Sequence, residues 1–160
     1  MKLHTEHGLP IVGIPGTIDN DITGTDYSIG FDTAIRNAVE AVDKIRDTAN
    51  SHARTFIVEV MGKNSPAIAL TVGICTGAEN VVLPGKEIDF KKIASDIDRG
   101  IKRGKTSSII IAAEGKVEGV SNTIQKELKE KYKLDAHVCI LGHIQRGGNP
   151  SPIDRLIASE

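Results

Sequence analysis

Short apolar runs alternate along the chain with segments in which apolar residues follow a helical period. The apolar runs predict β-strands at residues 10–14, 55–61, 80–83, 107–113 and 137–141. The intervening segments predict helices at residues 32–49, 67–76, 90–103, 123–131 and 153–160. The helix at 67–76 is apolar nearly all round, so we expect it to be buried. Repeated alternation of strand and helix predicts the α/β class, a three-layer αβα arrangement around a mostly parallel, Rossmann-like sheet.

Composition agrees with this fold class and narrows the type of function. Of the 160 residues, 39% are apolar but only 3% are aromatic, and an aliphatic core suits buried parallel strands. The formal net charge of −1 gives no reason to expect binding to nucleic acid or to a membrane surface. Cys75 and Cys139 each lie in an apolar run, which predicts buried, reduced thiols in a cytoplasmic protein. Both ends of the chain look like cuts through a longer protein.

The most informative local pattern directly follows the first predicted strand. Pro15 and Gly16 form a turn there, and Asp19 and Asp21 then place two carboxylates two residues apart. Open α/β sheets bind ligands outside the carboxyl ends of their strands. Two carboxylates this close repel each other, so they need a cation, a set of hydrogen-bond donors or a proton. A functional site is one interpretation, and a loop shaped by Asx turns is the structural alternative.

Charged residues also follow three of the later strands. Lys63 follows the second strand, Glu114 follows the fourth, and His143 and Arg146 lie in the glycine-rich segment 142–148 after the fifth. Because carboxyl ends of parallel strands meet at one edge, these residues are expected to gather there. Arginine and histidine beside a carboxylate are typical of a site that holds a small anion. A core histidine, turn glycines and a carboxylate in the first turn of a helix are the corresponding structural alternatives.

Three segments together resemble signatures of the 6-phosphofructokinase family. They are Pro15 to Asp21, Glu59 to Gly62 and Leu141 to Gly148, in the family's order and spacing, and the resemblance covers essentially the whole chain. It implies the central and C-terminal part of an enzyme of glycolysis that transfers the γ-phosphate of ATP to the 1-hydroxyl of fructose 6-phosphate. ATP is then the co-substrate and Mg²⁺ the cofactor.

The resemblance also implies roles for individual residues. Asp19 matches the base that takes the proton of the sugar hydroxyl, with Thr17 and Asp21 as the other catalytic residues and Asp21 acting on the magnesium environment. The implied substrate-binding residues are Thr17, Ile18, Asp19, Arg54, Met61, Gly62, Lys63, Glu114, His137, His143, Ile144, Gln145 and Arg146.

The family's assembly supplies a second set of expectations. Arg54 matches an arginine that reaches into a neighbouring subunit's site, which implies a homo-oligomer, expected to be a tetramer. An allosteric site for a nucleotide-type effector between subunits is implied, with Glu79 facing the effector's magnesium. Its residues are Arg46, Gly77, Ala78, Glu79, Arg103 and Lys105.

Three positions bear on substrate affinity and on the phosphoryl donor. Lys63 stands where many bacterial members have arginine, and lysine lacks the planar fork that binds phosphate through two bonds. His137 stands where arginine is common, and a neutral imidazole holds phosphate weakly, so we predict a sugar-phosphate affinity that improves at lower pH. Gly16 leaves room for a nucleotide where pyrophosphate-using relatives tend to carry lysine, which favours ATP.

Two alternatives to an ATP-dependent kinase remain open from the sequence. They are a pyrophosphate-dependent phosphofructokinase and a non-catalytic module that binds sugar phosphate or regulates. The resemblance divides the chain into three parts: residues 1–30 end the nucleotide-side catalytic domain, 31–142 form the sugar-phosphate and effector domain, and 143–160 return to the catalytic domain.

Overall fold

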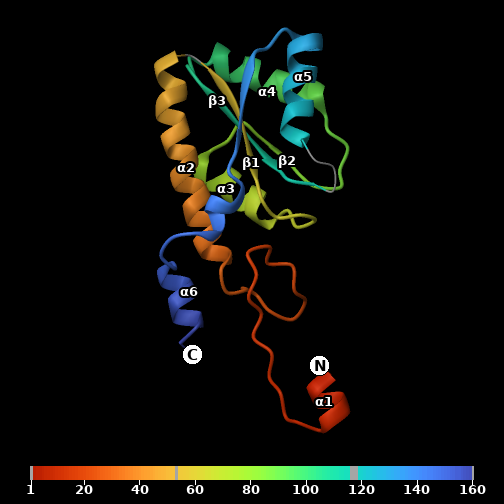
Figure 1. Cartoon of the computed structure of the whole chain (residues 1–160). Helices are drawn as coiled ribbons and strands as arrows, with labels where there is room; N and C mark the ends of the chain where they lie inside the picture. The colour runs from red at the N-terminus through yellow and green to blue at the C-terminus, as the bar shows by residue number, and fades with distance from the viewer. Residues whose placement is uncertain (1, 53, 116–118, 160) are drawn as a thin grey trace.

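A parallel sheet with helices on both faces forms the body of the protein in a computed structural model that describes residues 2–52, 54–115 and 119–159 (Figure 1). The elements in chain order are α1 (Lys2–His7), α2 (Phe31–His52), β1 (Thr55–Val60), α3 (Ala67–Thr76), β2 (Asn80–Val82), α4 (Phe90–Lys102), β3 (Ser108–Ala113), α5 (Val120–Tyr132), β4 (Ala136–Ile140), the 3₁₀ helix η1 (Gly142–Arg146) and α6 (Pro152–Ile157). The predicted α/β class is therefore confirmed, and the later strands and helices lie within a few residues of their expected bounds.

The four strands pair in the order β2-β3-β1-β4, and every pair is parallel. β1 lies between β3 and β4, with Val60 opposite Ala113 on one side and Glu59 opposite Ile140 on the other. All six residues of β3 are buried, as expected for a strand covered on both faces. This register brings the carboxyl ends of β1, β3 and β4 to the same edge of the sheet.

Two apolar cores flank the sheet because alternate strand residues point to opposite faces. Val58 and Val60 of β1 pack with Ala38 and Val42 of α2 and with α3. Ile57 of β1 faces the other way and packs with helices α4 and α5. Figure 1 shows the same three layers, and it also shows residues 2–30 extending away from the sheet toward α1 at the far end.

The first predicted strand, residues 10–14, is not formed. These residues lie in an irregular exposed segment, with Val12 90% and Ile14 74% exposed. An apolar run becomes a strand only when another strand satisfies its backbone groups. The structure gives this segment no such partner among the described residues, where a single bridge, Gly16 to Ile29, links the region to neighbouring chain.

Helix α3 also departs from its expected burial. Ile68 and Val72 are buried against the sheet, but Ile74 is 78% exposed and Cys75 is exposed as well. A helix that covers one face of a sheet has an outer side, and here that outer side is apolar. Cys139 is partly buried in β4, and this burial raises the pKa of its thiol, which keeps it protonated. Both thiols are free, as predicted.

Asp154 joins the C-terminal segment to the start of helix α2. Its side chain is 3% exposed and accepts hydrogen bonds from the backbone N–H of Gly30 and of Thr33, each at 2.8 Å, and from the Thr33 hydroxyl. Burial alone would raise the pKa of Asp154, but the bonds from Thr33, Gly30 and Ser151 together hold it below its usual value. The carboxylate also interacts favourably with the positive end of the α2 macrodipole.

In the described part of the chain, no helix is both long and apolar enough to cross a membrane.

Replacement of this carboxylate tests its contribution to stability. Asp154→Asn is expected to lower the free energy of unfolding by about 2 kcal/mol near neutral pH, because one of the two oxygens that accept from buried donors becomes an amide nitrogen. Since the folded pKa lies below the unfolded value of about 3.9, the contribution is full above that value and is lost as pH falls through the folded pKa. Urea unfolding between about pH 7 and pH 3 measures the difference between the two proteins.

Asp43→Asn, at an exposed position on the same helix, is the matched control and is expected to be close to neutral. A stability gap for Asp154→Asn that stays constant over the whole pH range would contradict the assignment.

Candidate active site at the carboxyl edge of the sheet

Three loops that carry predicted site residues meet where β1, β3 and β4 end. The N–H of Glu114 donates to the carbonyl of Val60 at 2.8 Å, and the N–H of Leu141 donates to the carbonyl of Glu59 at 3.0 Å. Beyond the strands, the N–H of Lys63 donates to a carboxylate oxygen of Glu114 at 3.4 Å. The structure therefore brings the Met61–Lys63 loop, Glu114 and η1 together.

The Met61–Lys63 loop is a tight turn that depends on glycine. Gly62 has φ +142°, and a Cβ at this position would lie 2.9 Å from the carbonyl oxygen of Ser65. That oxygen approaches because the N–H of Ser65 donates to the Gly62 carbonyl at 2.8 Å, closing the turn. Lys63 follows with φ 50° and an exposed side chain, while Met61 is buried.

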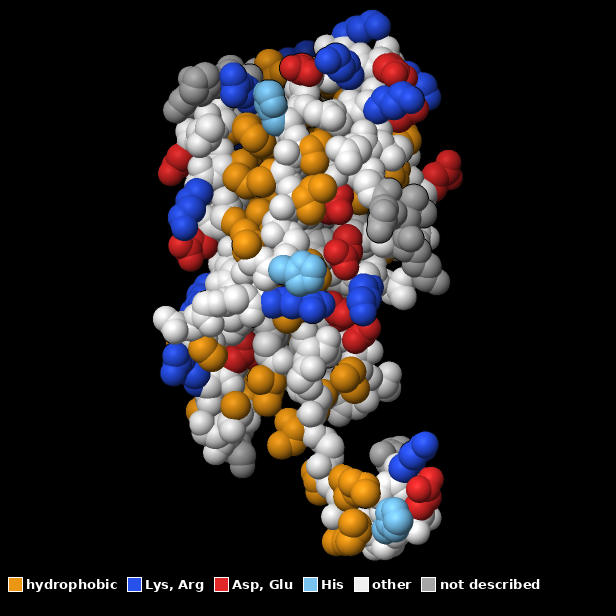
Figure 2. Space-filling view, viewed as in Figure 1, with side chains coloured by type: hydrophobic (Ala, Val, Ile, Leu, Met, Phe, Trp, Pro, Cys, Tyr) orange, Lys and Arg blue, Asp and Glu red, His pale blue; other side chains and the backbone are white. Residues whose placement is uncertain are grey.

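Helix η1 exposes two basic side chains, and its backbone is held in place by α2. His143 and Arg146 are exposed, as is Ile144 at 62%, whereas Gln145 is fully buried. The side-chain amide of Asn37 on α2 donates to the carbonyls of Gln145 at 3.2 Å and Gly147 at 2.7 Å. Figure 2 shows a histidine with Lys or Arg side chains directly below it and acidic side chains beside it, at about mid-height on this face.

The acidic turn, residues 17–21, is held by Asn20 and Ser28. The Ser28 N–H donates to the Asn20 side chain at 2.9 Å, and the Ser28 hydroxyl donates to the Thr17 carbonyl at 2.8 Å. Asn20 also has the left-handed φ of 48° that asparagine tolerates. Asn20 therefore supplies the side chain that shapes this loop. In these hydrogen bonds the side chains of Asp19 and Asp21 take no part.

The carboxylate of Asp19 is buried and available. Asp19 is 9% exposed, and its N–H donates to the Thr17 hydroxyl at 3.2 Å. Its carboxylate makes no hydrogen bond or ion pair with the residues that the structure describes, while Asp21 is exposed. No group of three or more His, Cys, Asp or Glu side chains is arranged to hold a metal ion in residues 2–52, 54–115 and 119–159.

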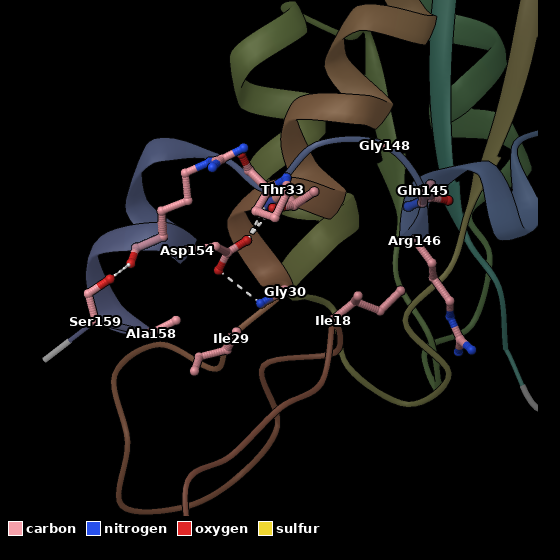
Figure 3. Close-up of a pocket in the computed structure, with 12 residues that line it drawn as sticks. Ile18, Ile29, Gly30, Thr33, Gln145, Arg146, Gly148, Asp154, Ala158 and Ser159 are labelled. Atoms are coloured by element: carbon pink, nitrogen blue, oxygen red, sulfur yellow. Dashed lines mark hydrogen bonds between the residues drawn. The ribbon is translucent and has the colours of Figure 1, made fainter.

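A cavity of about 490 Å³ connects the acidic turn with η1 (Figure 3). Ile18 and Arg146 both line it, whereas Asp19 and His143 are not among its lining residues. In Figure 3, Ile18 lies between Gly30 and Arg146, and the Arg146 side chain points away from Asp154. The cavity therefore joins Ile18, the residue before Asp19, to Arg146 of η1.

Two predicted substrate residues lie at the opposite edge of the sheet. Arg54 directly precedes β1 and has an exposed side chain, and His137 pairs with Phe56 near the start of β4. The rings of Phe56 and His137 lie 5.3 Å apart, and His137 is half-buried. Met61 lies five positions after Phe56, about 17 Å at the usual rise, and Arg54 lies two positions before Phe56. Arg54 and His137 are therefore remote from the other substrate residues of their own chain.

The predicted effector residues also lie at this amino edge of the sheet. Arg46 donates to the Thr76 carbonyl at 2.5 Å, next to Gly77, which ends α3 with φ 60°, and Ala78. Lys105 pairs with Glu79 at 2.5 Å, and the second oxygen of Glu79 accepts the Ile109 N–H at 2.6 Å. The carboxylate of Glu79 is thus bound within the chain.

Arg103 lies apart from this pair in a basic groove. The groove measures about 510 Å³ between α4 and the end of α5. Its lining residues are Lys91, Ala94, Ser95, Asp98, Arg99, Lys102, Arg103 and Tyr132.

Comparison with known proteins identifies the family. The model of the phosphofructokinase family matches residues 1–160. The chain belongs to the phosphofructokinase family. ATP-dependent 6-phosphofructokinase of Lactococcus lactis is 54% identical over 97% of this chain and 45% of its own length. The Bacillus subtilis enzyme of the same name is 53% identical over 99% of the chain and 49% of its own length. The chain therefore spans about half the length of the curated relatives it matches.

Solved phosphofructokinases share the fold. The phosphofructokinase of Saccharomyces cerevisiae superposes with a TM-score of 0.86 at 31% identity, over 99% of this chain and 23% of that one. A pyrophosphate-dependent phosphofructokinase from Marinobacter aquaeolei superposes with a TM-score of 0.74 at 25% identity, over 98% and 44%. The α/β architecture around the site is thus that of the family, as the sequence motifs predict.

The glycine of the Met61–Lys63 loop provides a test of the site's local geometry. Gly62→Ala is expected to destabilise the protein by about 2 to 3 kcal/mol, because φ lies in a region open only to glycine and the new Cβ meets the Ser65 carbonyl. Gly85→Ala is the matched control, since Gly85 has φ +71° and open space, and is expected to cost only about 1 kcal/mol. Thermal unfolding of both variants gives the comparison, and equal losses would count against the crowded turn.

Proposed function

We propose that this chain is part of an ATP-dependent 6-phosphofructokinase that transfers the γ-phosphate of ATP to the 1-hydroxyl of fructose 6-phosphate. The observation that carries the proposal is the Asp19 carboxylate, buried and unpaired among the described residues. It stands next to Ile18, which lines the same cavity as Arg146. The names and the 53–54% identity of the Lactococcus and Bacillus relatives support ATP as the donor.

In this proposal each group has one task in the transfer. Arg146 and His143 bind the 6-phosphate, where the guanidinium offers paired N–H donors. Glu114 accepts hydrogen bonds from sugar hydroxyls, while Thr17, Ile18, Met61, Gly62, Lys63, Ile144 and Gln145 line or position the sugar site. Asp19 accepts the proton of the 1-hydroxyl as that oxygen attacks the γ-phosphorus and the bond to ADP breaks. Orientation and charge stabilisation supply most of the acceleration in such transfers.

Magnesium fits the exposed acid of the same turn. Mg²⁺ is usually held by one or two carboxylates together with substrate phosphates, so Asp21 is the residue proposed to act on its environment. The ion would neutralise charge on the transferred phosphoryl group. In the chain itself, the exposed Asp21 carboxylate offers that contact, and Asp19 beside it remains the proton acceptor.

The alternatives differ in how they use Asp19. A pyrophosphate-dependent enzyme is less favoured, because the relative with that name is 25% identical whereas the ATP-dependent relatives are 53–54% identical. Gly16 meets no atom within 4 Å of a hypothetical Cβ, so the turn has space where a nucleotide would approach. A non-catalytic module for sugar phosphate would need Arg146 and His143 but not Asp19.

Replacement of Asp19 in the full-length protein separates these alternatives. Asp19→Asn is expected to lower kcat by about 10²- to 10⁴-fold, the usual contribution of a positioned base, while fructose 6-phosphate binding stays within a few-fold. Coupled assay of ADP release and calorimetric titration of the sugar phosphate measure the two effects. Asp26→Asn, exposed in the same loop, is the control and is expected to keep full activity. Unchanged transfer in Asp19→Asn would refute its role as base.

The assembly proposal follows from the two edges of the sheet. His137 lies about 17 Å from Met61 along the strand direction and Arg54 lies farther still, so we propose that they serve the site of a neighbouring subunit in a homotetramer. The amino-edge residues Arg46, Gly77, Ala78, Glu79, Arg103 and Lys105 are proposed to bind a nucleotide-type effector. Because Glu79 is paired with Lys105, contact with an effector-bound magnesium would first require that pair to open. A cytoplasmic, glycolytic role accords with this proposal.

Position 137 gives the proposal a charge test. His137→Arg in the full-length protein carries a permanent charge and a planar fork that binds phosphate through two bonds, so it is expected to bind fructose 6-phosphate more tightly. Binding titrations of both proteins give the comparison, and equal affinities would argue against phosphate contact at this position.

A further inference from the structure

Gln145 differs from every other residue of η1 that the family motif assigns to the substrate. Its side chain is fully buried, whereas His143, Ile144 and Arg146 on either side of it are exposed. A buried side-chain amide needs hydrogen bonds, because an unpaired polar group in the interior carries a desolvation penalty. What Gln145 bonds to therefore indicates what it does.

The side-chain oxygen of Gln145 completes the hydrogen bonding of strand β1. The N–H of Met61 donates to this oxygen at 2.9 Å, in the interior of the protein. β4 ends at Ile140 and the chain turns into η1, so the backbone of β4 no longer runs beside Met61. Gln145 supplies the acceptor from η1 instead. The bond fixes Met61, the first residue of the Met61–Lys63 loop, relative to η1.

The backbone of Gln145 is held from the other side by α2. Asn37 donates to the Gln145 carbonyl and to the Gly147 carbonyl, so η1 cannot shift without breaking these bonds. The amide nitrogen of Gln145 is buried without a partner among the described residues. Figure 3 shows this nitrogen on the side of the amide toward Thr33 and the oxygen on the other side. The side-chain oxygen of Gln145 thus accepts from Met61, and its amide nitrogen remains a donor without a partner among the described residues.

We propose that Gln145 is a positioning residue that sets the spacing between the Met61–Lys63 loop and the pair His143 and Arg146. This inference rests on the proposed function, in which the loop contacts the sugar and the pair binds its 6-phosphate. Gln145 acts through Met61 and need not touch the ligand. Loss of its acceptor releases the loop from η1, so both ends of the sugar phosphate can no longer be held at once. The effect falls on the sugar phosphate and not on the nucleotide.

The full-length enzyme with Gln145→Met provides the test, because methionine fills the space and offers no strong acceptor. KM for fructose 6-phosphate is expected to rise about tenfold, with KM for ATP within twofold of wild type. Gln145→Glu keeps an oxygen for the Met61 N–H, and its protonated form does so without a buried charge. Burial raises the pKa of such a carboxyl, so this variant is expected to recover affinity at about pH 6 relative to Gln145→Met.

Three outcomes overturn the proposal: an unchanged KM for the sugar phosphate in Gln145→Met, equal rises in KM for both substrates, or no recovery by Gln145→Glu at the lower pH. Val42→Ala, a buried change on α2 away from η1, controls for general destabilisation and is expected to leave both KM values unchanged. If Gln145→Met does not fold, Asn37→Ala replaces it, with a rise of at least about threefold expected for the sugar phosphate. An unchanged KM in Asn37→Ala then overturns the proposal.

The same assays keep this inference distinct from the proposed function. If the wild-type enzyme does not phosphorylate fructose 6-phosphate with ATP, the proposed function fails. If the wild type is active and binds the sugar phosphate but Gln145→Met matches it, the positioning role alone fails.

Discussion

Parallel pairing of β1 with β3 on one side and β4 on the other is the constraint on which the rest of the structure depends. Parallel strands all end at the same edge of the sheet, so the chain after each strand emerges beside its neighbours. The Glu114 N–H bond to Val60 and the Leu141 N–H bond to Glu59 fix this alignment at the last residues of the strands. The Met61 loop, Glu114 and η1 are neighbours for that reason, although they are far apart in the sequence.

Buried polar side chains then attach the terminal segments to this frame. Asp154 caps the start of α2 from a helix more than a hundred residues away, and Ser28 ties the acidic turn to the chain just before that helix. Asn37 holds η1 against α2 further along. Apolar packing is tolerant of small displacements, whereas a buried donor and acceptor must remain within hydrogen-bond distance. These few bonds therefore define the position of the acidic turn relative to η1 more narrowly than core packing does.

The sequence was sufficient for the repeating part of the fold because local period and strand length carry that information. β1 and α3 show this best, since both are short, mostly apolar segments and their bounds lie within one residue of the predicted ones. It was insufficient for residues 10–14, where the apolar run is real but strand formation needs a partner that local pattern does not reveal. The exposed outer side of α3, at Ile74 and Cys75, was mistaken for buried surface for the same reason.

The candidate site divides in the same way. The residues proposed to contact ligands come from the resemblance to the family, whereas Asn20, Ser28, Asn37 and Asp154 were not predicted. Their hydrogen bonds join residues up to 124 positions apart, and no local spacing in the sequence predicts these pairs. One signal was present: a Ser151-Pro152-x-Asp154 sequence is typical of a helix start, with serine as cap and an acid in the first turn. This pattern marks the start of α6, but it does not show that the acid serves helix α2 instead.

The division of the sheet into two functional edges explains why one chain would not complete the proposed site. The carboxyl edge carries the acidic turn, the Met61–Lys63 loop and η1. Arg54 and His137 lie at the amino edge, and the length of β1 separates the two edges. A strand in a sheet with its neighbours paired on both sides cannot shorten to bring the two edges together. In the proposed tetramer, Arg54 and His137 would therefore meet a sugar phosphate bound by a second subunit, because they lie at the opposite edge from the candidate site of their own chain. Residues near the beginning of β2 and β3, including Glu79 and Lys105, share that edge, so events at the proposed effector site and at the proposed shared contacts would act on the same side of the sheet.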